Sequence, residues 1–151
     1  MDKDQMYLGD HTVFKKTRYD TFMFLDPRDG VNFGIMLFGQ WEEAVTRQFI
    51  TAVKPGMTVL DLGAHSGYYS LLAGTRVGPS GSVHSFEPLP FHHKNFLKSV
   101  SVNGCHGRVH LHRVMLSNTR GEMEIRTRGE GGALYSCHRR DIIDPGSPER
   151  K

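Results

Sequence analysis

The sequence predicts an α/β protein in which a parallel β-sheet is flanked by helices. Residues 57–62 form an apolar run typical of a buried parallel strand, and a glycine turn leads from that run directly into a helical pattern. A second strand pattern at 82–86 is followed by another helical pattern, and a third strand pattern begins at 108. This alternation is typical of the first half of a doubly wound sheet.

The N-terminal residues predict a hairpin followed by a helix. Residues 11–38 alternate between apolar and polar side chains, and Asp26-Pro27-Arg28-Asp29-Gly30 in their midst is a turn sequence, so we expect two short strands joined there. In the next segment apolar side chains recur at every fourth position, at Trp41, Val45, Phe49 and Val53. That spacing predicts one face of a helix, which Pro55-Gly56 would end.

The remaining elements follow in order along the chain. A helix is expected at 66–75, and the turn at 78–81 prevents it from continuing. Another helix is expected at 90–102, with Gly104 as its C-terminal cap. The third strand is expected over 108–116, and a hairpin over 122–126 and 133–137. We therefore expect an N-terminal hairpin and lead-in helix at 1–53, a binding core at 54–138 and a flexible tail at 139–151.

Composition narrows the class of function. The chain has 151 residues and a net charge of +3, and residues 108–151 carry nine basic against six acidic side chains. These charges are interleaved and lack an aromatic stacking platform, which makes nucleic acid an unlikely partner. No apolar run approaches the roughly 18 residues of a membrane span. The polar, acidic first residues do not resemble a signal peptide, so we expect a cytoplasmic protein without a membrane partner.

The turn after the first core strand is the first candidate site. Asp61, Gly63 and Gly67 form the pattern D-x-G-x-x-x-G, in which glycines let a ligand approach the backbone and the next helix offers free N–H groups. The pattern lacks the G-x-G-x-x-G of a dinucleotide site, which favours a nucleoside without a pyrophosphate. The Asp61 carboxylate suits an amino group. A purely structural turn stays an alternative.

A second acid strengthens this prediction. Glu87 follows Asp61 by 26 residues and ends the next strand, so a right-handed crossover brings both carboxylates to the same edge of the sheet. One carboxylate at that position is able to accept hydrogen bonds from both hydroxyls of a ribose. The alternative is a surface acid beside the start of the following helix.

Together these segments resemble the FkbM family of S-adenosylmethionine-dependent methyltransferases. The resemblance rests on the stretches GQWE at 39–42, KPGMTVLDLGAHSGYYSLLA at 54–73, GPSGSVHSFEPLP at 78–90, NFLKSVSVNG at 95–104 and LSNTRGE at 116–122. It implies a Rossmann-like methyltransferase fold with S-adenosylmethionine as cofactor and an oxygen of a small molecule or sugar as the methyl acceptor.

The resemblance also implies a set of cofactor-binding residues. Asp61, Gly63 and Gly67, with Ala64 and His65 between the glycines, would hold the methionine end, and Glu87 would bind the ribose. Pro88 and Leu89 would lie near the adenine, Glu42 beside the pocket, and Ser117 is a further adenine candidate. No catalytic base and no metal site are assigned.

The sequence departs from the family at two places. His65 stands where the family commonly has Asn; His tolerates a positive φ, but its protonated ring would repel a sulfonium, so affinity should weaken below about pH 6.5. The family also continues into a strand and loop of the type K-I-D-V-E-G, and nothing like it follows Cys137. The C-terminal half of the fold is therefore expected to be missing. The first core strand would then be an exposed apolar edge, so that either a second copy or a partner chain covers it or the chain is prone to aggregate.

Several alternatives stay open. The chain could be a cofactor-binding module without turnover, or a truncated enzyme that needs a partner, or an NAD-binding or other nucleoside-binding domain. Among single residues, His110 and His112 share one face of a strand and could chelate a metal ion. His92 and His93 could act as a general base, although an exposed pair is the simpler interpretation.

Overall fold

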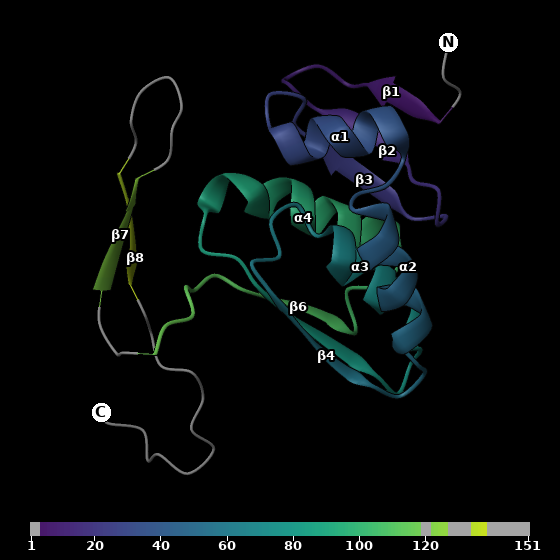
Figure 1. Cartoon of the computed structure of the whole chain (residues 1–151). Helices are drawn as coiled ribbons and strands as arrows, with labels where there is room; N and C mark the ends of the chain where they lie inside the picture. The colour runs from purple at the N-terminus through teal and green to yellow at the C-terminus, as the bar shows by residue number, and fades with distance from the viewer. Residues whose placement is uncertain (1–3, 119–121, 127–133, 139–151) are drawn as a thin grey trace. The chain divides into compact units, whose positions relative to one another are not determined.

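The computed structural model of the chain describes residues 4–118, 122–126 and 134–138, and its packing divides the chain into two compact units, Met1–Arg113 and Val114–Lys151 (Figure 1). The first unit holds an antiparallel sheet, a parallel sheet and the helices α1 to α4; the second holds a hairpin. The boundaries expected at 53/54 and 138/139 stay predictions, and the expected tail lies outside the described residues.

The antiparallel sheet is formed by the first strands of the chain. In the order β1-β2-β3, its strands are Gln5–Tyr7, Val13–Lys16 and Phe22–Leu25. Strand β2 pairs with β1 on one side and with β3 on the other. The hairpin is therefore closed through residues 17–21, where the hydroxyls of Thr17 and Thr21 are hydrogen-bonded at 2.7 Å.

The hairpin predicted around residues 26–30 is wrong, because a helix follows that turn. Helix α1 spans Gly30–Phe38, and the Asp29 carboxylate caps its start by accepting a hydrogen bond from the Asn32 N–H at 2.8 Å. An aspartate before a glycine signals a helix N-cap as well as a hairpin turn. Gly34 in this helix contacts Trp41 so closely that a Cβ there would lie 2.8 Å from the indole ring.

Helix α2 confirms the predicted lead-in helix with a different inward face. It spans Glu43–Ala52 and ends before Pro55. Thr46 is its fully buried residue, whereas Val45, which the spacing of four placed inside, is exposed. The Thr46 hydroxyl donates a hydrogen bond to the Trp41 carbonyl at 2.6 Å, so it has a partner in its buried position.

The parallel sheet confirms the predicted strand and helix order. Its strands are β4 (Thr58–Leu62), β5 (Ser82–Phe86) and β6 (Val109–His112), in the order β4-β5-β6. The crossovers are made by helices α3 (Tyr68–Arg76) and α4 (Pro90–Val102). Strand β6 is shorter than the predicted 108–116. Strand β4 lies at an edge of the sheet, as expected for an unpaired first strand.

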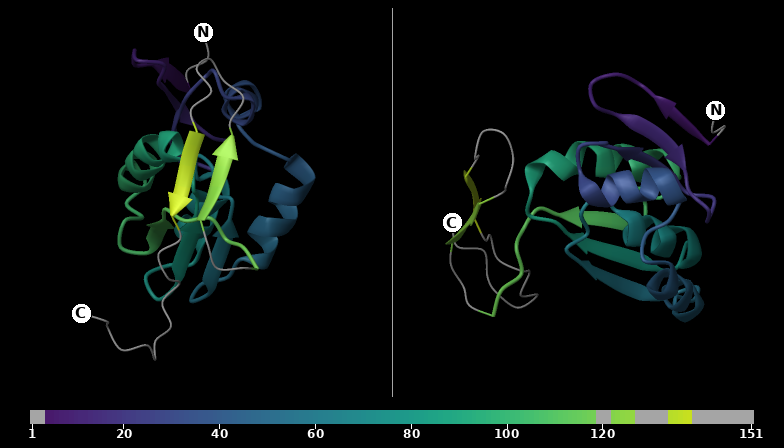
Figure 2. Two further views of the ribbon diagram at one scale, coloured as in Figure 1. Left: turned by 90° about the vertical axis from the view of Figure 1, so that its left-hand side faces the viewer. Right: turned by 45° about the horizontal axis from the view of Figure 1, so that its top comes forward.

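The helices cover one face of this sheet. Figures 1 and 2 show α3 and α4 on the same side of the strands. On that side Val83 and Val109 are buried against a core that includes Leu71, Leu72 and Phe96. On the opposite face Leu60 and Leu62 are 62% and 63% exposed. The expectation that residues 57–62 would be buried on both faces is therefore wrong for this face.

Helix α4 also holds the antiparallel sheet. The side chain of Asn103 binds the backbone of Phe22 twice, accepting from its N–H at 2.9 Å and donating to its carbonyl at 2.6 Å. The Ser99 hydroxyl accepts from the Phe24 N–H at 2.9 Å. We call these bonds the Asn103 clamp. They satisfy backbone groups on the edge of β3 that does not face β2.

The second unit contains the predicted C-terminal hairpin. Strands β7 (Glu122–Arg126) and β8 (Leu134–His138) pair in antiparallel fashion, with Glu122 opposite His138 and Arg126 opposite Leu134. The second strand begins one residue later than predicted.

Candidate functional site

A pocket of about 330 Å³ lies at the carboxyl end of β4, a volume within the range of small-molecule sites. Its walls come from the start of α1, the segment before α2, the end of β4, the glycine turn and the start of α3. The lining residues are Val31, Trp41, Glu42, Asp61, Leu62, Gly63, Ala64, His65, Ser66, Tyr68 and Tyr69. The pocket thus brings together five of the predicted site residues, Glu42, Asp61, Gly63, Ala64 and His65.

The turn over β4 depends on left-handed backbone at three positions. Gly63, His65 and Gly67 have φ of 82°, 52° and 91°. The N–H groups of Gly63 and Ala64 both donate to the Phe86 carbonyl, at 2.9 and 3.0 Å, which fixes the turn to the end of β5. The predicted positive φ at His65 is confirmed.

The two glycines of the motif have different surroundings. A Cβ at Gly63 would meet nothing within 4 Å, so the backbone there is open. A Cβ at Gly67 would lie 2.6 Å from the ring of Phe96 on α4. Gly67 therefore has a packing reason of its own, whereas Gly63 leaves room for a ligand beside the turn.

Asp61 faces the helix-covered side of the sheet. Its Oδ2 accepts a hydrogen bond from the Ser70 hydroxyl at 2.5 Å, and Ser70 in turn is 2.7 Å from the Ser85 hydroxyl. Burial raises the pKa of Asp61 because desolvation disfavours the charged carboxylate, and the Ser70 hydrogen bond acts in the opposite direction. The pocket therefore contains a carboxylate with few protein partners that would gain from a cationic ligand.

Glu87 supports the turn from beneath. It is only 4% exposed. Its Oε2 accepts from the His65 N–H and its Oε1 from the Leu89 N–H, both at 2.8 Å. Each oxygen keeps a second acceptor position, so these bonds are compatible with the predicted ribose contact but add a structural role that the sequence did not reveal.

Glu42 and Tyr69 form the opposite wall. The Tyr69 hydroxyl donates to Glu42 Oε2 at 3.0 Å. Glu42 has a φ of 42°, an unfavourable backbone for a residue other than glycine, and such strain often accompanies functional sites. Burial raises the pKa of the Tyr69 phenol. The wall therefore presents a carboxylate and a protonated phenol next to the indole of Trp41.

The remaining predicted residues lie outside the pocket lining. Gly67, Glu87, Pro88 and Leu89 belong to the adjoining turn and to the start of α4, where Leu89 is the N-cap residue. Ser117 belongs to the second unit, so its contact with an adenine stays a prediction. The cofactor roles of all these residues stay predictions as well.

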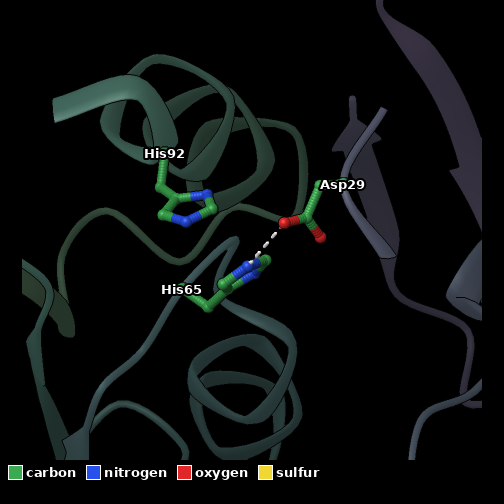
Figure 3. A group of neighbouring side chains, drawn as sticks. All are labelled: Asp29, His65 and His92. Carbon is green, nitrogen blue, oxygen red and sulfur yellow. Dashed lines mark hydrogen bonds and ion pairs between the residues drawn. The ribbon is translucent and has the colours of Figure 1, made fainter. Parts of the chain in front are cut away.

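Figure 3 shows a cluster that the sequence did not suggest, formed by Asp29, His65 and His92. The Oδ2 of Asp29 is 3.1 Å from Nε2 of His65, and the rings of His65 and His92 are 3.8 Å apart between centroids. Burial lowers the pKa of His92 to about 3, so this ring is neutral at physiological pH. The predicted weakening of cofactor affinity at low pH stays a prediction.

The prediction that His92 and His93 form an exposed pair is wrong, since both are buried. His93 Nε2–H donates to the Glu87 carbonyl at 2.8 Å, which fixes this ring under the site. His110 and His112 do share a face of β6, but His112 Nε2 is 3.0 Å from Nδ1 of His84 and forms a hydrogen bond with it.

No helix among the described residues is both long and apolar enough to span a membrane. No family model matches the chain, and no curated protein matches it.

Solved structures do resemble it. TYW2 of P. horikoshii in complex with MeSAdo aligns with a TM-score of 0.56 and 19% identity over 77% of this chain and 40% of that protein. TYW2 of M. jannaschii in complex with AdoMet gives 0.52 and 16% over 72% and 46%. The complex of aTrm5 and tRNALeu gives 0.51 and 12% over 74% and 31%.

These likenesses show the fold. The chain has a Rossmann-like α/β fold, as the sequence predicted, with its parallel strands and crossover helices in the expected order. It spans less than half of the length of each of these three proteins.

Proposed function

We propose that the pocket at the end of β4 binds S-adenosylmethionine and that the chain serves in methyl transfer. The pocket chemistry carries this proposal. Glu42 and Asp61 place two carboxylates in it, and none of the described residues that line it is Lys or Arg. A site of this charge suits a ligand that carries both a sulfonium and an ammonium group, and the aromatic face of Trp41 suits the same cations.

The chain's own residues have separable tasks in this proposal. Asp61 accepts hydrogen bonds from the amino group, the open backbone at Gly63 and Ala64 borders the methionine part, and the second acceptor positions of Glu87 serve the ribose. Two of the similar structures are complexes with MeSAdo and AdoMet, which supports an adenosyl ligand on this fold. The assignment to the FkbM family rests on the sequence resemblance.

When bound, S-adenosylmethionine would supply a methyl group activated by its positive sulfur. The chain's part is then to hold donor and acceptor in line and to keep water out. On the basis of the sequence resemblance to the FkbM family, we propose an oxygen of a small molecule or sugar as the methyl acceptor. Tyr69 and Glu42 are the polar groups across the pocket from Asp61 and are candidates for positioning it.

Calorimetry with S-adenosylhomocysteine tests the binding step. Asp61→Asn keeps an oxygen for the Ser70 hydroxyl but removes the charge, so we expect affinity to fall about 10- to 100-fold, the range for a hydrogen bond to a charged group. Asp20→Asn is the matched control, because Asp20 is exposed on the surface and pairs with Lys16. No heat with the wild-type chain at millimolar ligand would contradict the proposal.

Glu87→Gln is a second variant for the same calorimetry. Its amide retains one oxygen for the His65 N–H but lacks the charged carboxylate that is proposed to bind the ribose.

A competition experiment tests the alternative ligand. If NAD competes for the site as well as S-adenosylhomocysteine does, a dinucleotide-binding domain is favoured instead. Binding without formation of S-adenosylhomocysteine from the donor, across a panel of hydroxyl acceptors, would favour a module without turnover.

An RNA acceptor is the lesser, second candidate: the likeness to aTrm5, which was solved with tRNALeu, favours it, and residues 108–151 have more basic than acidic side chains, although the two kinds are interleaved. RNA binding that uses these charges must weaken steeply with salt. If the chain does not bind tRNA at 50 mM salt, an RNA acceptor is excluded.

A further inference from the structure

Three potential ligand side chains meet beside the pocket from distant parts of the chain. Asp29 caps α1, His65 lies in the glycine turn and His92 lies in the first turn of α4. One ligand atom from each lies within 4.8 Å of the other two. Figure 3 shows the carboxylate and the two rings facing one another. Two imidazoles and one carboxylate form a ligand set that divalent transition metals favour.

His92 lacks the partners that a buried imidazole normally has. It is 4% exposed, and no described residue forms a hydrogen bond with either of its ring nitrogens. Its neighbour His93, buried to a similar degree, has the Glu87 carbonyl as a partner. No hydrogen bond within the described residues therefore competes for the ring nitrogens of His92, and one of them is available to a metal ion that lies between His92 and its neighbours.

His65 is able to switch to the form that a metal requires. Without an ion, Nε2–H donates to Asp29 Oδ2, and Nδ1, 3.3 Å from the Ser66 hydroxyl, accepts from it. A metal at Nε2 needs the other tautomer, with Nδ1–H donating to the same hydroxyl. Because a hydroxyl both donates and accepts, Ser66 satisfies either form and would orient the ring as an outer partner of the metal.

We propose that Asp29, His65 and His92 bind a divalent transition-metal ion, for which zinc is the reference probe. Ligands about 2.1 Å from zinc at a tetrahedral angle are about 3.4 Å apart, close to the 3.1 Å between Asp29 and His65. The ligand atom of His92 lies within 4.8 Å of the other two, so its ring must move closer to join them. Asp29 and His65 side chains are 26% and 28% exposed, which leaves an approach for the ion from solvent.

The proposal does not depend on methyl transfer. The ion would join α1, the glycine turn and α4, and three protein ligands would leave a fourth position for water or another oxygen ligand. Since His65 lines the pocket, that position would lie at the rim of the proposed cofactor site.

Metal binding to the untagged full chain tests the proposal directly. After treatment with a chelator and its removal, Co²⁺ is titrated while its visible d–d absorption is followed, and Zn²⁺ is then added in competition. We expect one equivalent of Co²⁺ to bind and one of Zn²⁺ to displace it. Asp29→Asn and His92→Gln should each weaken Zn²⁺ binding at least about tenfold.

His112→Gln is the matched control, because it removes a histidine of the other close pair and leaves the three ligands intact. Asp29→Asn retains an oxygen that caps α1, so it tests the site even if His92→Gln does not fold, which circular dichroism checks. The proposal is overturned if the wild-type chain binds no stoichiometric Co²⁺, if Asp29→Asn binds like wild type, or if His112→Gln loses the ion instead.

Discussion

The two faces of the parallel sheet have the same strands and opposite environments. On the covered face Val83 and Ser85 of β5 are fully buried, and Asp61 of β4 contacts Ser70 of α3. On the other face the neighbouring residues Leu60 and Leu62 are more than half exposed. Because side chains alternate along a strand, a shift of one position moves a residue from the core to the open face.

The proposed binding residue Asp61 and the exposed leucines of β4 therefore belong to opposite faces of the same sheet. The carboxylate proposed to bind the cofactor belongs to the covered face, where helices α3 and α4 restrict its environment. The open face instead presents leucines with the histidines of β5 and β6. The chemistry of the proposed site thus depends mainly on the helices on one side of the sheet, although Leu62 of the open face also lines the pocket.

The largest expected difference comes from one substitution made on each side. Leu71→Ala on α3 removes a fully buried side chain and should lower the free energy of unfolding by about 3–5 kcal/mol. Leu60→Ala, the same change on the open face, should stay within about 0.5 kcal/mol. Urea unfolding followed by circular dichroism measures both. Equal losses would show that the open face is covered in solution.

The glycines of the turn repeat the contrast on a smaller scale. Gly67→Ala should destabilise the fold by about 2–4 kcal/mol, since the new methyl overlaps Phe96 in addition to the strain of a positive φ. Gly63→Ala carries the backbone strain alone, about 1–2 kcal/mol. The same unfolding measurement compares them, and a Gly63 variant that is the less stable of the two would refute the assigned roles.

The open face should show itself by association rather than stability. Among the described strands, β4 lies at one edge of the parallel sheet and has two exposed leucines, a surface prone to contact a second copy. Leu62→Lys should reduce concentration-dependent association in sedimentation experiments, with a change in unfolding free energy within about 0.5 kcal/mol. Lys54→Arg, an exposed charge-retaining change, serves as control. A wild-type chain that stays monomeric at high concentration contradicts this expectation.

The smallest expected effect is the pH dependence due to Asp61. Its raised pKa means that the folded chain holds a proton in a pH range where the unfolded chain, with an ordinary value of about 3.9, has lost it. The stability that this proton provides is present below pH 3.9 and disappears as the pH rises through the folded-state pKa. Asp61→Asn should therefore gain stability relative to wild type on going from pH 4 to pH 7. A parallel pH profile for both proteins would contradict the assigned burial.

Periodicity in the sequence was sufficient to predict the parallel sheet and its crossover helices. Strand β5 and helix α4 have the predicted bounds, because strands repeat every two residues, helices every 3.6, and the Gly and Pro residues between them end each element. The place of Asp61 at the carboxyl end of β4 followed from the same pattern.

Local sequence was insufficient to predict the structure at positions where contacts with distant residues determine it. Residues 30–38 are rich in β-forming side chains, yet the Asp29 cap and the contact between Gly34 and Trp41 accompany a helix there. The neighbours of His65 could not be predicted either, since Asp29 lies 36 residues before it and the intervening elements must fold first. The backbone bonds of Glu87 depend likewise on the geometry of the finished turn.

The Asn103 clamp has a consequence for the order of folding. It joins residues 81 positions apart in the chain, against 24 for the paired residues of β4 and β5, so closing it costs about 1 kcal/mol more chain entropy than forming that crossover. We therefore expect β3 to dock after the parallel sheet has formed. Asp29, four residues beyond β3, reaches His65 only at that late step, and the cluster beside the pocket would report the completion of folding.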